Sequence, residues 1–159
     1  MNTYLKAKNS FLLILFLFLN FSLAVEAASP INTLKSSFFG KDTNTAISGY
    51  DPVAYFIQNQ AVEGSEKYIT EWKGANWRFA NKENLTKFKA DPTKYAPQYG
   101  GYCAYGVSQN YLVKVDPEQF SIINNKLYLN YSRSVKNTWL QNPHGYIKNA
   151  DKNFPDLIK

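Results

Sequence analysis

The sequence contains a single cysteine, Cys103, and this limits how the folded chain can be stabilised. One thiol cannot form a disulfide within the chain, so the fold must depend on a hydrophobic core. The cysteine lies in the segment 95–107, together with four tyrosines and three glycines. Glycine permits close approach of the backbone or a ligand, and tyrosine combines an apolar ring with a polar hydroxyl. This segment is therefore the first candidate for a functional site.

The N-terminus has the pattern of a secretory signal peptide. Two lysines precede an uninterrupted apolar run at 11–19, and small residues follow, with Val25 and Ala27 at the −3 and −1 positions of a cleavage site. A membrane-spanning helix needs about 20 apolar residues, and this run is shorter. We therefore expect residues 1–27 to be a signal peptide and the protein to be exported, either to the periplasm or out of the cell. The alternative is an uncleaved membrane anchor.

The rest of the chain divides into a leader and one domain. Residues 28–45 are mostly polar and should either lie over the domain or stay loose, and the Phe38–Phe39 pair within them should dock on it. Residues 46–157 have a usual size for one domain. The net charge of the full chain is +6, and its lysines are scattered rather than clustered. A scattered basic surface and export both argue against nucleic-acid binding, and no stable membrane span is expected after signal removal.

The residue patterns predict an α+β fold, in which small antiparallel hairpin sheets pack against several short helices. Strand-forming residues flank two turn sequences, and capping and apolar residues mark helices. The expected elements are a helical turn at Pro52 capped by Asp51, a hairpin at 66–80 with a four-residue connection at 73–76, a helix at 81–95 broken at Asp91–Pro92, a strand at 111–115, a hairpin at 120–129 turning at Asn124–Asn125, and two helices, one carrying Val135 and Trp139 and one beginning at Pro143. In the first hairpin, Trp77 and Phe79 should share one face and Arg78 should point to the other.

Cys103 is open to three interpretations. It can pack in the core, contact a ligand or a soft metal such as copper(I) or zinc, or act as a reactive thiol. The only histidine, His144, follows Pro143 at a predicted helix start, and nothing in the spacing brings it to the thiol. A Cys–His pair would be needed both for a thiol hydrolase and for a modest metal site. No metal-binding, nucleophile-elbow or phosphate-loop motif is present in the sequence, so the residues favour a module without catalysis.

Several ordered segments resemble the YHS-domain family, in the form of its exported, stand-alone members. The matching residues are 46–56, 72–75, 77–80, 88–104 and 126–130, together with Trp139. The resemblance covers residues 46–157, which is nearly the whole mature domain. The wider family includes modules attached to copper-exporting ATPases and other metal-handling proteins, with cysteines at the places of Ala54, Ala80 and Asn84. Metal binding implied by the resemblance would therefore have to depend on Cys103.

Three hypotheses for the function follow. The first is an exported binding module whose pocket is lined by Tyr55, Tyr102, Cys103 and Tyr105, and which holds a small ligand or a copper-type thiophilic metal. In its metal form, Cys103 and His144 are the candidate ligands. The second is a structural or interaction domain in which Cys103 only packs. The third, an enzyme with Cys103 as nucleophile, is disfavoured because no base can be assigned.

Overall fold

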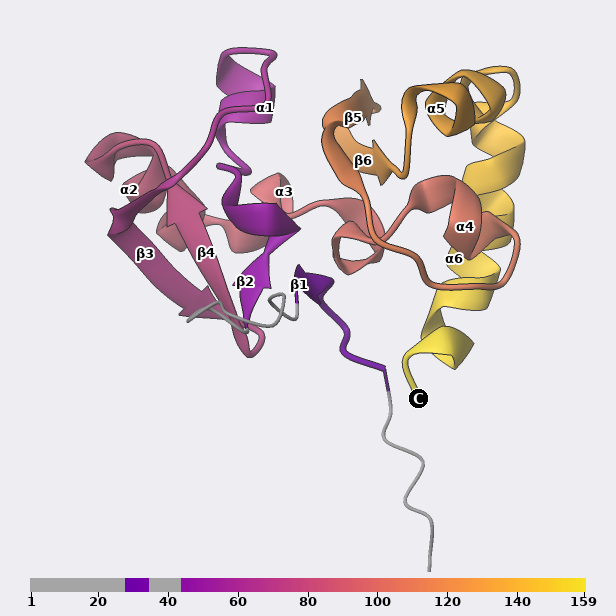
Figure 1. Cartoon of the computed structure of the whole chain (residues 1–159), viewed down its shortest axis with the longest axis horizontal. Coiled ribbons are helices and arrows are strands. Elements are labelled where there is room, and N and C mark those ends of the chain that lie inside the picture. The colour runs from indigo at the N-terminus through magenta and orange to yellow at the C-terminus, as the bar shows by residue number, and fades with distance from the viewer. Residues whose placement is uncertain (1–27, 35–43) are drawn as a thin grey trace, which may run out of the picture.

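The computed structural model describes residues 28–34 and 44–159, and it confirms the predicted α+β class. Figure 1 shows two halves, a sheet half (residues 44–96) and a helical half (residues 102–115 and 131–159), with a hairpin (residues 116–130) between them and the short helix η2 at the joint. The elements are β1 Thr33–Leu34, β2 Thr45–Ala46, η1 Ile47–Gly49, α1 Ala54–Ile57, β3 Ser65–Trp72, β4 Ala75–Phe79, α2 Lys82–Ala90, α3 Pro92–Tyr95, η2 Gln98–Gly101, α4 Ala104–Ser108, β5 Asp116–Ile123, β6 Lys126–Asn130, α5 Arg133–Leu140 and α6 Pro143–Leu157.

The first sheet has four strands in the order β1-β2-β4-β3. The β3–β4 pair is the predicted hairpin, but the four-residue connection was wrong. Trp72 pairs directly with Ala75, so the turn contains only Lys73 and Gly74, with φ values of 50° and 73°. Two central residues with positive φ define a type I′ turn, whose twist matches that of the strands it joins. A Lys-Gly pair is a weak signal for this turn, so the connection appeared longer in the sequence.

The sheet half is stabilised by a cluster of aromatic side chains. Trp77 and Phe79 are fully buried on one face of β4, as predicted, and Phe88 of α2 lies 5.2 Å and 5.1 Å from their rings. Asn81 caps α2 by accepting a hydrogen bond from the backbone N–H of Asn84. The buried members of this sheet-side core are Ile31, Ala46, Ile47, Val53, Tyr55, Ala75, Trp77, Phe79, Phe88, Tyr95, Ala96, Leu127 and Leu129.

Asp51 is fully buried, and its carboxylate is well supplied with donors. It accepts hydrogen bonds from the backbone N–H groups of Val53, Ala54 and Ala80 and from the side-chain amide of Asn84. The predicted capping role is therefore observed at the start of α1. Such a carboxylate has a structural role. If one donor were removed, a buried carboxylate oxygen would have neither that hydrogen bond nor water, and the fold would be less stable.

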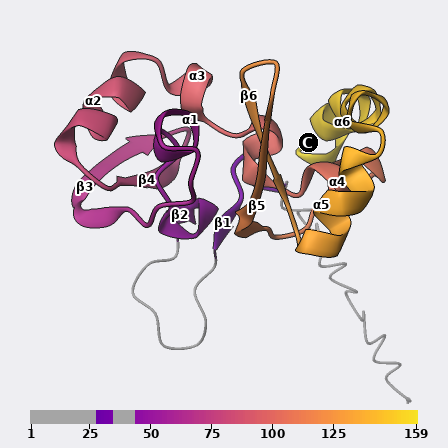
Figure 2. The same cartoon turned by 90° about the horizontal axis from the view of Figure 1, so that it is seen from above.

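The second hairpin, β5–β6, stands between the two halves (Figure 2). Its turn is Asn124–Asn125, as predicted, with both residues at positive φ. Side chains alternate along β6, so Leu127 and Leu129 join the sheet-side core while Tyr128 joins the core of the helical half. The members of this helix-side core are Tyr99, Ala104, Val107, Tyr128, Trp139 and Ala150.

The strand predicted at 111–115 was wrong. These residues belong to no helix or strand, and β5 begins only at Asp116. Their apolar side chains contact different parts of the molecule: Leu112 packs on the helix-side core, Val115 on the sheet-side core, and Val113 on α4. A Cβ atom added to Gly106 would lie 2.9 Å from Val113, so the segment lies directly against this helix. The backbone C=O of Val113 accepts a hydrogen bond from the N–H of Cys103.

The two C-terminal helices agree with the sequence prediction. Ser132 caps α5 and Asn142 caps α6 through their side chains, and Trp139 and Ala150 are fully buried. Among the described residues, no helix combines the length and apolar character needed to cross a membrane.

The N-terminal segment 28–34 lies on the domain rather than extending away from it. Ile31 is buried in the sheet-side core. Asn32 donates hydrogen bonds to the backbone C=O groups of Gly100 and Gly101, at 2.8 Å from its N–H and 3.0 Å from its amide. This part of the predicted leader is therefore a structural part of the fold. The Phe38–Phe39 pair lies outside the described residues.

Candidate functional site

Cys103 lies at the start of α4, in the core of the molecule. Its Sγ accepts hydrogen bonds from the backbone N–H groups of Gly106 at 3.4 Å and Tyr131 at 3.3 Å, and its S–H points to Oδ1 of Asn130 at 3.7 Å. The residue is only 1% exposed. Burial raises the pKa of the Cys103 thiol, and the backbone donors offset this only in part. The side chain therefore caps a helix as a neutral thiol, which is a structural role.

The three tyrosines proposed to line a pocket with Cys103 do not converge on one. Tyr55 belongs to the sheet-side core, and its hydroxyl donates to the backbone C=O of Pro117 at 3.0 Å. The Tyr102 hydroxyl donates to the backbone C=O of Ser29, and the Tyr105 ring packs on another tyrosine of α6. Each of these side chains has a structural partner of its own. None of the three, nor Cys103, lines the cleft described below.

The residues around Cys103 do not fit a copper-type metal site. His144 is exposed in the first turn of α6, and no hydrogen bond joins it to Cys103 in the described part of the chain. That part also contains no group of three or more His, Cys, Asp or Glu side chains placed to hold a metal ion. The Cys103 sulfur is buried against two backbone N–H groups and one amide oxygen, and within residues 28–34 and 44–159 no hydrogen bond or metal-type cluster brings a second soft ligand to it.

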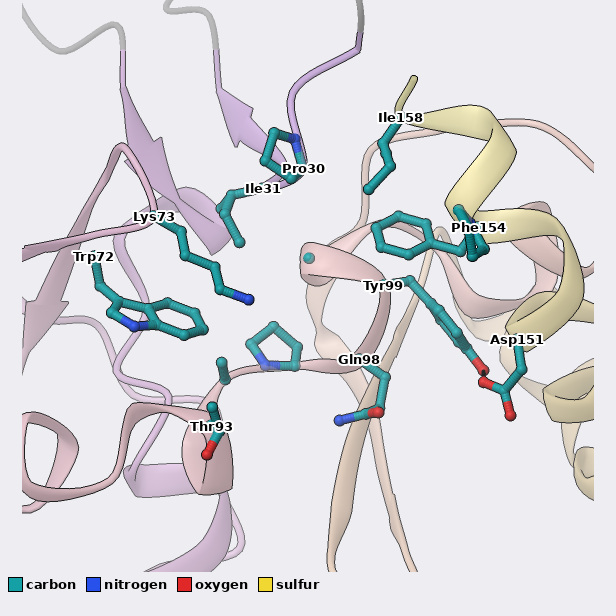
Figure 3. Close-up of a pocket in the computed structure, with 14 residues that line it drawn as sticks. Pro30, Ile31, Trp72, Lys73, Thr93, Gln98, Tyr99, Asp151, Phe154 and Ile158 are labelled. Atoms are coloured by element: carbon teal, nitrogen blue, oxygen red, sulfur yellow. Dashed lines mark hydrogen bonds between the residues drawn. The ribbon is translucent and has the colours of Figure 1, made fainter.

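A cleft of about 370 Å³ lies where the two halves meet, and we call it the central cleft (Figure 3). Four stretches of chain far apart in sequence line it: the N-terminal segment, the β3–β4 turn, the joint between the halves, and the end of α6. The lining residues are Pro30, Ile31, Trp72, Lys73, Thr93, Ala96, Pro97, Gln98, Tyr99, Gly100, Asp151, Phe154, Pro155 and Ile158. Somewhat more than half of this surface is apolar, and the rest is polar.

The floor of the central cleft has an unusual backbone. Tyr99, Gly100 and Gly101 have positive φ in succession, at 56°, 61° and 84°. Positive φ is unfavourable for a bulky residue such as tyrosine, and such conformations are concentrated at functional sites. The Tyr99 hydroxyl donates to Oδ1 of Asp151 at 2.9 Å, so the side chain is held against α6. Burial and the Asp151 carboxylate raise the pKa of Tyr99, so this phenol stays protonated as a donor.

The N-terminal segment forms one wall through Pro30 and Ile31. It can do so because residue 100 is glycine: an added Cβ would lie 1.9 Å from the backbone oxygen of Pro30. No side chain could fit in this space, so the glycine allows the segment to close one side of the cleft. The glycine-rich segment singled out in the sequence is therefore part of a site, although through its glycines rather than its cysteine.

The two facing walls come from the β3–β4 turn and from α6. The indole of Trp72 is fixed by Trp77 and Phe88, whose rings lie 5.8 Å and 5.9 Å away. In Figure 3, Trp72 and Lys73 lie on one side of the cleft and Phe154 and Ile158 on the other.

Sequence reasoning missed Trp72, Lys73 and Phe154 as site residues, although it placed Trp72 in a hairpin and expected a helix from Pro143. Their meeting depends on how two distant elements pack, and no local spacing encodes it. A signal was available in the Tyr99–Gly101 segment, since consecutive glycines beside aromatic residues indicate close backbone packing.

Comparison of the chain with known protein families, curated proteins and solved structures gave no match. The resemblance to YHS domains therefore stays a prediction from the sequence.

Proposed function

We propose that this protein is a binding module without catalysis, which holds a small organic molecule in the central cleft. One observation carries the proposal: a cleft of about 370 Å³ that is open to solvent, combines apolar and polar groups, and is formed by four separate stretches of chain. Its volume lies in the range of about 300–1,000 Å³ that is usual for small-molecule sites. Export of the protein and its affiliation to the YHS group, both drawn from the sequence, are parts of the same proposal.

The chemistry of the lining supports binding rather than catalysis. Among the described residues, the lining contains neither cysteine nor histidine, and the one phenol in that part, Tyr99, is already hydrogen-bonded to Asp151. A nucleophile with an adjacent base is the usual signature of covalent catalysis, and the lining offers no such pair. Cys103, which the enzyme hypothesis requires, is buried outside the cleft.

The proposal is tested by screening a fragment library against the isotope-labelled full chain by NMR. We expect a subset of fragments to shift the Trp72 indole and Gly100 resonances. Ile158→Trp should abolish these shifts, because Ile158 lines the cleft and an indole there would fill it. Lys159→Trp is the matched control, because Lys159 is next to Ile158 in the chain but is exposed and does not line the cleft. Fragments that shift no cleft resonance, or that bind Ile158→Trp unchanged, would refute the proposal.

A second measurement distinguishes ligand binding in the cleft from the alternative of copper binding at Cys103. Copper(I) is titrated anaerobically into wild type and Cys103→Ser in competition with a chromophoric chelator. With the thiol buried among N–H donors, we expect no difference between the two proteins. Binding below about micromolar that depends on Cys103 would instead favour a metal-binding module and would displace the cleft as the functional site.

A further inference from the structure

The central cleft carries a positive charge that no other described residue neutralises. Lys73 is the first residue of the type I′ turn between β3 and β4, and it is exposed beside Trp72. Within residues 28–34 and 44–159, its ammonium has no carboxylate partner. Its one contact is with the Trp72 ring, whose centroid lies 4.7 Å from Nζ. An ammonium over an indole is attracted by the ring, but its charge remains available to an anion.

The opposite wall carries a carboxylate, but one already engaged. Asp151 accepts the Tyr99 hydroxyl and lies on α6, across the cleft from Lys73 (Figure 3). Its negative charge disfavours an anion at that wall and favours one at the Lys73 wall. The apolar residues Ile31, Pro97 and Phe154 also line the cleft. The cleft is therefore polarised, with a cation at one wall and a carboxylate at the other.

A second polar group lies on the floor with its hydrogen-bonding capacity unused. The side-chain amide of Gln98 is half-buried and lines the cleft, and the described residues provide it with no hydrogen-bond partner. An amide and an ammonium are both hydrogen-bond donors to an anion, and the ammonium is the stronger because it is charged. Neither group would be satisfied by a purely apolar ligand.

We infer that the ligand of the central cleft is a small organic acid, with its carboxylate at Lys73 and its apolar body between Trp72 and Phe154. This deepens the proposed function and rests on it. Charge-assisted hydrogen bonds are stronger than neutral ones, and because Lys73 is exposed the pair should be sensitive to salt. The apolar body provides most of the buried area, while Lys73 selects acids over neutral and cationic analogues.

The test uses three probes with one ring system: naphthylacetate, its neutral amide, and the amine naphthylethylamine. Affinities for the full chain are measured by calorimetry at low and high salt. We expect the acid to bind at least about threefold more tightly than the amide, and the advantage to shrink with salt. Lys73→Gln should remove this advantage and leave amide binding unchanged. Lys67→Gln is the matched control, because Lys67 also lies over an aromatic ring, 5.5 Å from that of Tyr68, but outside the cleft.

Each remaining outcome decides against the inference. Equal binding of acid and amide, or an acid preference that survives Lys73→Gln, would overturn the role of Lys73. Tighter binding of the amine would assign charge selection to Asp151 instead. If none of the three probes binds while library fragments still shift cleft resonances, the inference fails and the proposed function stands. If no fragment shifts those resonances either, the proposed function has failed with it.

Discussion

Gly100 is the residue on which docking of the N-terminal segment depends, and Gly100→Ala tests this directly. The added methyl group would lie 1.9 Å from the backbone oxygen of Pro30, far inside van der Waals contact. Because the obstructing atom belongs to the backbone, no side-chain rotation can relieve the overlap. The segment around Pro30 and Ile31 must therefore leave its place, and the central cleft must lose one wall.

The magnitude follows from the contacts that the segment makes. Release exposes Ile31, which is 3% exposed in the fold, and burial of such a side chain contributes about 1.5–3 kcal/mol. Release also breaks the two hydrogen bonds of Asn32 and the one from Tyr102 to Ser29, each worth about 0.5–1.5 kcal/mol. The freed backbone regains entropy of about 1–2 kcal/mol per residue, so the two sums are of similar size. Because the segment is docked in the fold, docking is favourable on balance, and we expect Gly100→Ala to lose at least about 1 kcal/mol beyond the backbone penalty of alanine at positive φ.

Gly74→Ala provides the matched control for that backbone penalty. Gly74 has φ of 73°, close to the 61° of Gly100, but nothing lies within 4 Å of its added Cβ. Alanine in the left-handed region should therefore lower the free energy of unfolding of both variants by about 1–2 kcal/mol. Only Gly100→Ala should also displace the N-terminal segment. The free energies of unfolding are measured by urea denaturation of both variants and wild type.

A double-mutant cycle makes the test independent of the exact magnitude. Ile31→Ala should destabilise the wild type by about 2 kcal/mol or more but should have little effect in the Gly100→Ala background, where Ile31 is already released. If Gly100→Ala is no more destabilising than Gly74→Ala, or if the two losses simply add, the N-terminal segment does not dock against Gly100 and the reasoning is refuted.

Two further predictions concern titratable groups. Cys103 in the native protein should resist a thiol reagent at pH 8 and react only on unfolding, because the buried thiol has a raised pKa; rapid labelling of native protein, followed by absorbance, would contradict this. The free energy of unfolding should fall as pH rises above about 9–10, since the unfolded chain ionises Cys103, Tyr55 and Tyr99 near their ordinary pKa values of 9.0 and 10.0 while the folded chain keeps them protonated. Tyr99→Phe should make this fall shallower in urea titrations at successive pH values, and an unchanged slope would show that Tyr99 titrates normally in the fold.

Much of the fold could be predicted from the sequence, because its signals are local. The alternation of Trp77 and Phe79, the Asn124–Asn125 turn and the cap at Asn142 each depend on residues close together in the chain. The prediction failed at 111–115, where the apolar side chains pack on α4 and on both cores without pairing in a sheet. An alternating pattern indicates which side chains are buried and does not indicate what covers them.

The candidate site was harder to predict, because it forms between elements that are distant in sequence. The segment 95–107 stood out for its composition, and part of it does form the cleft floor. The thiol of this segment is chemically the most unusual group in it, but the residue that forms the cleft is Gly100, because it lets the N-terminal segment approach. Lys73 gave no signal at all, since an exposed lysine in a turn is usually only solvated.

The β5–β6 hairpin has a consequence for how the molecule can be divided. Figure 1 suggests two bodies, yet Leu127 and Leu129 complete one core while Tyr128 between them belongs to the other. A break at the joint near residue 97 would leave the sheet half with a hole in its interior and the helical half with two leucines facing water. The two halves are thus obliged to fold in one cooperative step, and neither could be exchanged between proteins as a separate unit. The cleft at their meeting place therefore exists only in the complete, folded chain.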